Sequence, residues 1–249
     1  MSEQVLLALD EPRVIPLTIH GRVVRFHVGV IAENDWLKYF SGITNQTLQR
    51  DSLREMIYDD ACAADELVRS VVRSVEGYSS PCQGEWRRQL PLAHVAAVAT
   101  VLTAVGIDTA DVAEPCFSDL IEVSLVAAWS QSATGTMQQY NGLIHRFRQP
   151  TATQLKRFRT ECARTWITGS SKEPVTHYAP RQIVAARLYD DMIQSVEGYS
   201  VHGHALTDDI AAICRHMDAL HKAVAVMQVF SPRGEDVMIG TAADEAVEG

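Results

Sequence analysis

Ser74-Val75-Glu76-Gly77-Tyr78-Ser79 recurs as Ser195-Val196-Glu197-Gly198-Tyr199-Ser200, which is 195 − 74 = 121 residues further along the chain. At the same spacing, His20-Gly21 stands opposite Asn141-Gly142. A chain that contains one pattern twice is typical of two related structural units, which present two versions of one surface. The sequence therefore predicts an internal duplication, with one unit in each half of the chain.

Each unit is predicted to begin with a β-hairpin. Apolar residues alternate on both sides of His20-Gly21, which indicates two strands and a two-residue turn. Asn141-Gly142 takes this place in the second unit, and this pair favours a hairpin turn because both residues adopt positive φ.

Three helices are predicted to follow each hairpin. The first helix of the second unit is marked by a capping box, Thr151-Ala152-Thr153-Gln154, and by an apolar stripe that continues to Trp166. Gly77 and Gly198 are interpreted as the glycines that end the middle helices. The three helices are expected over 37–48, 67–75 and 92–105 in the first unit and over 151–166, 188–196 and 208–230 in the second.

The predicted fold class is mainly α with small antiparallel β-hairpins (α+β), built from an internally duplicated hairpin-plus-three-helix unit. Residues 1–130 form the first unit and include a bridging helix from Pro115 to Trp129. Residues 131–232 form the second unit, and residues 233–249 form an acidic, flexible tail.

Composition excludes several classes of function. The net charge is −9, which argues against non-specific binding of the whole molecule to nucleic acid or to an anionic membrane. Apolar runs stay shorter than the roughly 18–20 residues that a membrane span needs. The N-terminal sequence lacks the basic segment of a signal peptide, and the five cysteines are widely spaced. These features predict a cytoplasmic protein with reduced thiols and no membrane partner.

The sequence contains no motif that identifies an enzymatic reaction. The glycine-rich nucleotide loops, the nucleophile elbow and the HExxH zinc motif do not occur. The sequence thus gives no catalytic residue, cofactor or metal ligand, and we expect a protein that is not an enzyme. One histidine- and cysteine-containing group leaves metal binding open: His202, His204, Cys214, His216 and His221.

Charge distinguishes the two units. The stretch 146–187 has nine basic and two acidic residues, 9 − 2 = +7, whereas 33–66 has three basic and eight acidic residues, 3 − 8 = −5. The contrast has three interpretations: drift of two solvated faces, complementary contact between units or chains, or an acidic partner for the second unit. The candidate partner-binding residues are Arg157, Arg164, Arg159, Lys156 and Arg148. Arg157 and Arg164 are expected on one helical face, because seven residues make about two turns.

The stretch from Asn141-Gly142 through Arg146-Phe147-Arg148 and Pro150-Thr151 to Phe158 resembles proteins of tailed-phage and prophage structural modules, in particular tail-assembly chaperones. These begin with a short hairpin, followed by Phe-x-x-Pro-Thr and then helices. The first unit has Val30-Ile31-Ala32-Glu33 where Pro-Thr would stand. The resemblance implies an acidic, helical, non-enzymatic protein that holds the tape-measure protein before the tail tube polymerises.

The sequence therefore predicts a non-catalytic phage-type assembly or structural protein that acts through protein–protein contacts. Its partner would be a phage tail or other virion component, or a second copy of the chain, in the host cytoplasm or in the virion. One alternative is a nucleic-acid-associated regulator that uses the basic second unit. The other is an enzyme with a site between the units.

Overall fold

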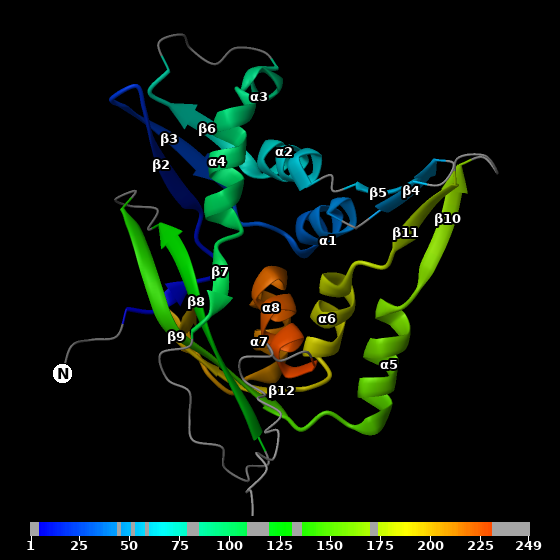
Figure 1. Ribbon diagram of the computed structural model, residues 1–249. Helices are drawn as coiled ribbons and strands as arrows, with labels where there is room; N and C mark the ends of the chain where they lie inside the picture. Colours follow the sequence, from blue (N-terminus) through cyan, green and yellow to red (C-terminus); the bar gives the residue numbers. More distant parts are fainter. Residues whose placement is uncertain are drawn as a thin grey trace, which may run out of the picture.

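A computed structural model describes residues 5–43, 46–50, 53–57, 60–78, 85–108, 120–130, 136–169 and 174–230 (Figure 1). The side chains of residues 46–50, 53–57, Ser130 and Gly169 lie outside this description. The predicted tail at 233–249 also lies outside it.

The first unit follows a short N-terminal strand, β1 (Leu7–Ala8). Its elements, in chain order, are β2 (Arg13–Ile19), β3 (Arg22–Val28), α1 (Glu33–Gly42), β4 (Gln46–Arg50), β5 (Leu53–Ile57), α2 (Asp60–Val71), β6 (Val72–Glu76), α3 (Trp86–Gln89), α4 (Leu92–Leu102) and β7 (Val105–Ile107).

The second unit repeats this order from its first strand to its fifth. Its elements are β8 (Leu120–Ser130), β9 (Met137–Arg148), α5 (Ala152–Cys162), β10 (Thr165–Gly169), β11 (Pro174–Tyr178), α6 (Arg181–Tyr189), β12 (Ile193–Glu197), β13 (Tyr199–Val201), β14 (His204–Leu206), α7 (Ile210–His216) and α8 (Ala219–Phe230). Five strands and two helices thus recur in the same order, and β13–β14 is an insertion in the second unit.

The sheets preserve the repeat in detail. β3 lies between β2 and β6, and β9 lies between β8 and β12. Each outer strand carries a β-bulge, since the register of β6 passes over Arg73 and the register of β12 passes over Gln194. These positions are 194 − 73 = 121 residues apart, the spacing of the sequence repeat. The bulge therefore occurs at the same place in both units.

The recurring hexapeptide ends these outer strands. Gly77 and Gly198 both have positive φ, 96° and 88°. A Cβ at Gly77 would lie 2.5 Å from the carbonyl oxygen of Val23, and a Cβ at Gly198 would lie 3.2 Å from that of Gly142. Glycine is therefore needed both for the backbone conformation and for the close approach of a neighbouring strand. The interpretation of these glycines as helix ends is wrong.

The prediction of a mainly α fold is also wrong, because the described residues form an α+β structure with 14 strands and 8 helices in four sheets. The predicted middle helices lie too far toward the C-terminus. α2 ends at Val71 and the chain continues as β6, while α6 ends at Tyr189 and β12 begins at Ile193. Pairing with β3 and β9 satisfies the backbone groups of these segments and overrides their helical pattern.

Three further elements differ from their predictions. Asn141-Gly142 does not form a turn, because β9 continues through it with a register irregularity against β8. The described part of the predicted bridging helix, from Leu120 onward, is strand β8. The single helix expected over 208–230 is divided into α7 and α8, which meet around Met217 and Asp218. The capping box, in contrast, is confirmed at the start of α5.

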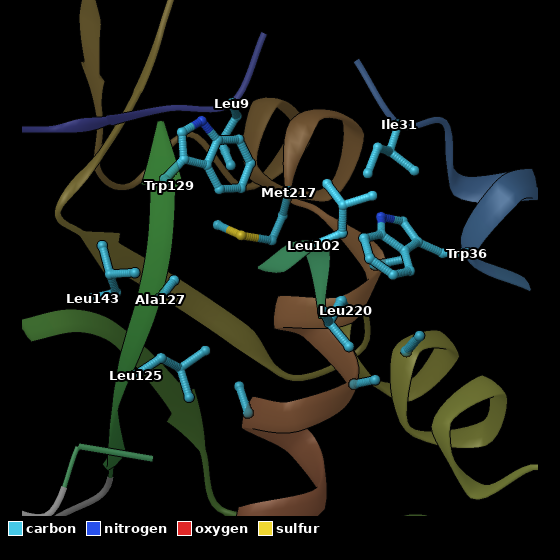
Figure 2. Packing of buried hydrophobic residues seen from close by; sticks show 14 of the residues in the cluster. Leu9, Ile31, Trp36, Leu102, Leu125, Ala127, Trp129, Leu143, Met217 and Leu220 are labelled. Carbon is cyan, nitrogen blue, oxygen red and sulfur yellow. The ribbon is translucent and has the colours of Figure 1, made fainter. Parts of the chain in front are cut away.

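The two units share one hydrophobic core. Leu9, Ile31, Trp36 and Leu102 of the N-terminal half lie in the same cluster as Trp129, Met217 and Leu220 of the C-terminal half (Figure 2). Three of the sheets bring the halves together as well, because β1 pairs with β13, β7 with β8 and β4 with β11. Within the described residues, no helix combines the length and the apolar character that crossing a membrane requires.

Candidate functional site

The sheet that contains β4 and β11 joins the two units through the hairpins β4–β5 and β10–β11. Its strand order is β10-β11-β4-β5, so a hairpin of the second unit is continued by a hairpin of the first (Figure 1). The junction is antiparallel, with Val175 opposite Leu48, Thr176 opposite Thr47 and His177 opposite Gln46. Backbone hydrogen bonding therefore connects the duplicated units directly.

This junction is not symmetric. β4 is the first strand of its hairpin, whereas β11 is the second strand of its own. Each hairpin thus uses a different edge, and the two remaining edges, β5 and β10, lie at opposite ends of the sheet. An edge strand presents backbone N–H and C=O groups on which another strand can pair.

Large apolar side chains are exposed on edge strand β10. Ile167 is 70 % exposed and Trp166 is 48 % exposed. The indole of Trp166 stacks on the imidazole of His177 in β11, with ring centroids 5.2 Å apart and planes inclined by 5°. Thr168 Oγ1 and His177 Nε2 form a hydrogen bond of 2.7 Å. These contacts fix the outer face of the hairpin and leave Ile167 directed to solvent.

Sequence reasoning missed this surface. It placed Trp166 on the apolar stripe of a helix, but α5 ends at Cys162 and Trp166 lies in β10. The run Thr165-Trp166-Ile167-Thr168 is rich in β-branched and aromatic residues, which is a strand signal. That signal identifies β10, although local sequence does not show which strand pairs with it.

The five predicted partner-binding residues are all exposed, but they do not form the arrangement that the sequence suggested. Lys156, Arg157 and Arg159 are on α5, whereas Arg164 follows the end of that helix. Arg157 and Arg164 therefore do not share a helical face, because the helix does not reach Arg164. Arg148, at the end of β9, hydrogen-bonds the carbonyl oxygen of Asp191.

Arg157 already has two carboxylate partners within the chain. Its Nε lies 2.9 Å from Glu161 Oε1, and its Nη1 lies 3.3 Å from Asp191 Oδ2. The hydrogen bond that Arg157 donates to Glu161 is the main reason that the pKa of Arg157 is raised. Neither carboxylate belongs to the acidic stretch 33–66, so these ion pairs do not join the two oppositely charged stretches.

A chain of hydrogen bonds between buried aromatic and imidazole groups crosses the core of the second unit. The hydroxyl of Tyr189 lies 2.8 Å from His145 Nδ1, and the hydroxyl of Tyr199 lies 2.8 Å from His145 Nε2. The Tyr199 hydroxyl also lies 2.9 Å from His221 Nδ1. Burial lowers the pKa of His145 well below its ordinary value and that of His221 to about 3. Both imidazoles are therefore neutral at pH 7. A neutral imidazole has one donor and one acceptor nitrogen, so His145 donates a hydrogen bond to one tyrosine hydroxyl and accepts one from the other.

A buried ion pair lies beside this chain. Arg13 Nη2 is 3.2 Å from Asp218 Oδ2, and the Arg13 guanidinium lies over the ring of Trp129. Burial lowers the pKa of Arg13 to about 9 and raises that of Asp218. The pair borders a cavity of about 190 Å³ that is also lined by Lys222, whose ammonium contacts Asp190 at 2.7 Å. Arg13 and Lys222 thus each have a carboxylate partner, which a buried charge requires.

The histidine- and cysteine-containing group does not converge on one point. His221 belongs to the buried chain, whereas His202 Nδ1 lies 2.6 Å from Asp10 Oδ2 and its ring is 6.1 Å from that of His216. Across the part of the chain that the structure describes, no group of three His, Cys, Asp or Glu residues is placed to hold a metal ion.

Comparison of the chain with protein-family models, with curated proteins and with solved structures gives no match. The candidate site is therefore defined by geometry alone, as the four-stranded sheet β10-β11-β4-β5 with its two edges.

Proposed function

We propose that the protein is a non-catalytic structural or assembly subunit that works through protein–protein contacts. The observation that carries this proposal is the sheet β10-β11-β4-β5, in which two copies of one hairpin pair and leave an edge at each end. The exposed side chains of Trp166 and Ile167 on β10 support it, because exposed apolar residues on a strand edge favour association.

The polar groups of the core support a non-catalytic role. Both ring nitrogens of His145, Nδ1 of His221 and the hydroxyls of Tyr189 and Tyr199 hydrogen-bond one another, whereas the buried Nε2 of His221 has no hydrogen-bond partner among the described residues. These groups do not line the described cavity next to Arg13 and Asp218. A general acid or base needs contact with its substrate, and the buried chain offers none in this conformation.

Within this class, we propose an assembly protein of the tailed-phage type. The support is the resemblance of the stretch around Phe147 and Pro150-Thr151, where a strand ends and Thr151 caps a helix. Affinity capture from the native cell tests this narrower proposal, with recovery of a tail component as the expected result. Recovery of a partner unrelated to virions would contradict it while leaving the broader class in place.

Sedimentation velocity at several protein concentrations tests the broader proposal. We expect species with masses that are multiples of the 27.5 kDa chain, or a stable complex with a captured partner protein. A 27.5 kDa species at every concentration, together with no partner in the capture experiment, would contradict the proposal. Salt-dependent retention on DNA would instead support a nucleic-acid-associated regulator.

A further inference from the structure

We propose that copies of this chain associate head to tail, by antiparallel pairing of β5 in one chain with β10 in the next. The contact reproduces between chains the junction that β4 and β11 form within the chain. This inference rests on the proposed assembly function and adds the partner, a second copy, and the surfaces that meet.

The duplication specifies which strands are equivalent. β11 begins 174 − 53 = 121 residues after β5, and β10 begins 165 − 46 = 119 residues after β4. β5 is therefore the counterpart of β11, and β10 is the counterpart of β4. Because β11 pairs with β4 inside the chain, pairing of β5 with β10 between chains joins the same two kinds of edge.

The same equivalence predicts the register. Val175 corresponds to Arg54 and Leu48 corresponds to Ile167, so the observed pair Val175–Leu48 becomes Arg54 opposite Ile167 of the next chain. The two neighbouring pairs become Glu55 opposite Trp166 and Met56 opposite Thr165. A one-residue slip would turn every side chain to the other face of the sheet, so register is a strict test.

A second copy fits these edges for two reasons. First, β5 and β10 are the counterparts of β11 and β4, which pair with each other within the chain. The backbone geometry of β5 and β10 is therefore suited to the same contact. Second, the exposed Ile167 and Trp166 side chains of β10 would lie against the neighbouring strand and lose contact with water. Head-to-tail contacts of this kind do not close on a dimer, and they produce rings or filaments.

Disulfide trapping tests the proposed register. In the variant Arg54→Cys, Ile167→Cys, the two cysteines of one chain lie at opposite edges of the four-stranded sheet. Three inter-strand spacings separate them by roughly 14 Å, which is too far for a disulfide. A disulfide between positions 54 and 167 must therefore connect two chains. Under mild oxidation we expect a ladder of covalent multimers from this variant.

Two matched controls accompany the variant. Leu48→Cys, Val175→Cys places cysteines at the equivalent junction within the chain, and we expect an intramolecular disulfide with no ladder. In a mixture of the two single variants, Arg54→Cys and Ile167→Cys, each chain carries only one introduced cysteine. It should give a covalent dimer and no higher species. The wild type sets the background from its native cysteines.

The outcomes separate the inference from the function on which it rests. Disulfides between two copies of position 54, or between two copies of position 167, would show symmetric pairing and overturn the head-to-tail inference alone. Multimers in sedimentation without a 54–167 disulfide would do the same. Failure of both self-association and partner capture would overturn the proposed function as well.

The variant Ile167→Lys tests the same edge without oxidation. A lysine on an exposed edge strand opposes strand addition, and position 167 is 70 % exposed, so the fold should be retained. We expect self-association to weaken on the order of tenfold or more. Val5→Lys, at a 51 % exposed residue outside this sheet, is the control. Equal association of the wild type and both variants would overturn the inference.

Discussion

At the scale of single residues, the core of the second unit contains polar side chains that hydrogen-bond one another. His145 is fully buried, yet both of its ring nitrogens have tyrosine hydroxyl partners. Tyr199 connects it to His221 in turn. Sequence patterns did not reveal this chain, because its members come from β9, α6, β13 and α8 and meet only after folding.

The neutral state of His221 gives a prediction about pH. Its pKa is lowered from 6.5 to about 3 by burial and by the charge of Arg13, so the unfolded chain binds its proton at a higher pH than the folded chain. The contribution of the neutral His221 imidazole to the free energy of unfolding is fully present above about pH 6.5 and is lost as pH falls towards 3. In this window, the loss amounts to on the order of 1 kcal/mol per pH unit.

Urea unfolding of the wild type and of His221→Gln between pH 8 and pH 4 measures this effect. Glutamine can still hydrogen-bond the Tyr199 hydroxyl but does not titrate. We expect the stability advantage of the wild type to shrink as pH falls below about 6.5. His204→Gln makes the same substitution at an exposed histidine. A stability difference between wild type and His221→Gln that stays constant with pH would contradict the prediction.

At the scale of elements, the two units share a glycine at the point where two neighbouring strands approach closely. Gly77 and Gly198 follow equivalent bulged strands, and both face a carbonyl oxygen of the adjacent strand. We expect Gly77→Ala to lower the free energy of unfolding by about 2–4 kcal/mol. The substitution places a Cβ on a residue with positive φ, and this Cβ clashes with the carbonyl oxygen of Val23.

Gly21→Ala is the matched control for this substitution. Gly21 also has positive φ, 77°, but an added Cβ would meet nothing within 4 Å. We expect it to cost only about 1–2 kcal/mol, the penalty of the left-handed conformation. Chemical denaturation measures both variants. Equal losses would mean that the contact with Val23 contributes nothing.

Local signals at this scale identified some elements and missed others. The capping box of α5 and the turn at His20-Gly21 were predictable, because each depends on neighbouring residues alone. The hairpins β4–β5 and β10–β11 were missed, since a helical spacing of apolar residues extended the predicted helix over Trp166. The pairing of β4 with β11 depends on the arrangement of both units, and no local pattern contains that information.

At the scale of the whole molecule, the duplicated units behave as one folded body. Leu102 of α4 and Leu220 of α8 lie in the same buried cluster (Figure 2). The sheet formed by β12, β9, β8 and β7 also continues from one half of the chain to the other. Unfolding one unit would therefore expose apolar surface of its neighbour.

We accordingly predict a single cooperative unfolding transition. Leu102→Ala and Leu220→Ala should each lower the free energy of that transition by about 2–5 kcal/mol, because both leave cavities in the common core. Tryptophan fluorescence and far-UV circular dichroism should report the same midpoint. Leu92→Ala, at a residue that is 71 % exposed, should leave the midpoint almost unchanged. Two transitions, each sensitive to one core variant, would contradict the prediction.

Strand β1 pairs with a strand that is synthesised much later. Leu7 is fully buried, and in β1 it lies opposite Tyr199 of β13, 199 − 7 = 192 residues later in the chain. At translation rates of about 5–20 residues per second, the ribosome needs roughly 10–40 s to produce that partner. Strand β1 is therefore synthesised long before its partner, and the two can pair only after Val201, the last residue of β13, has been made.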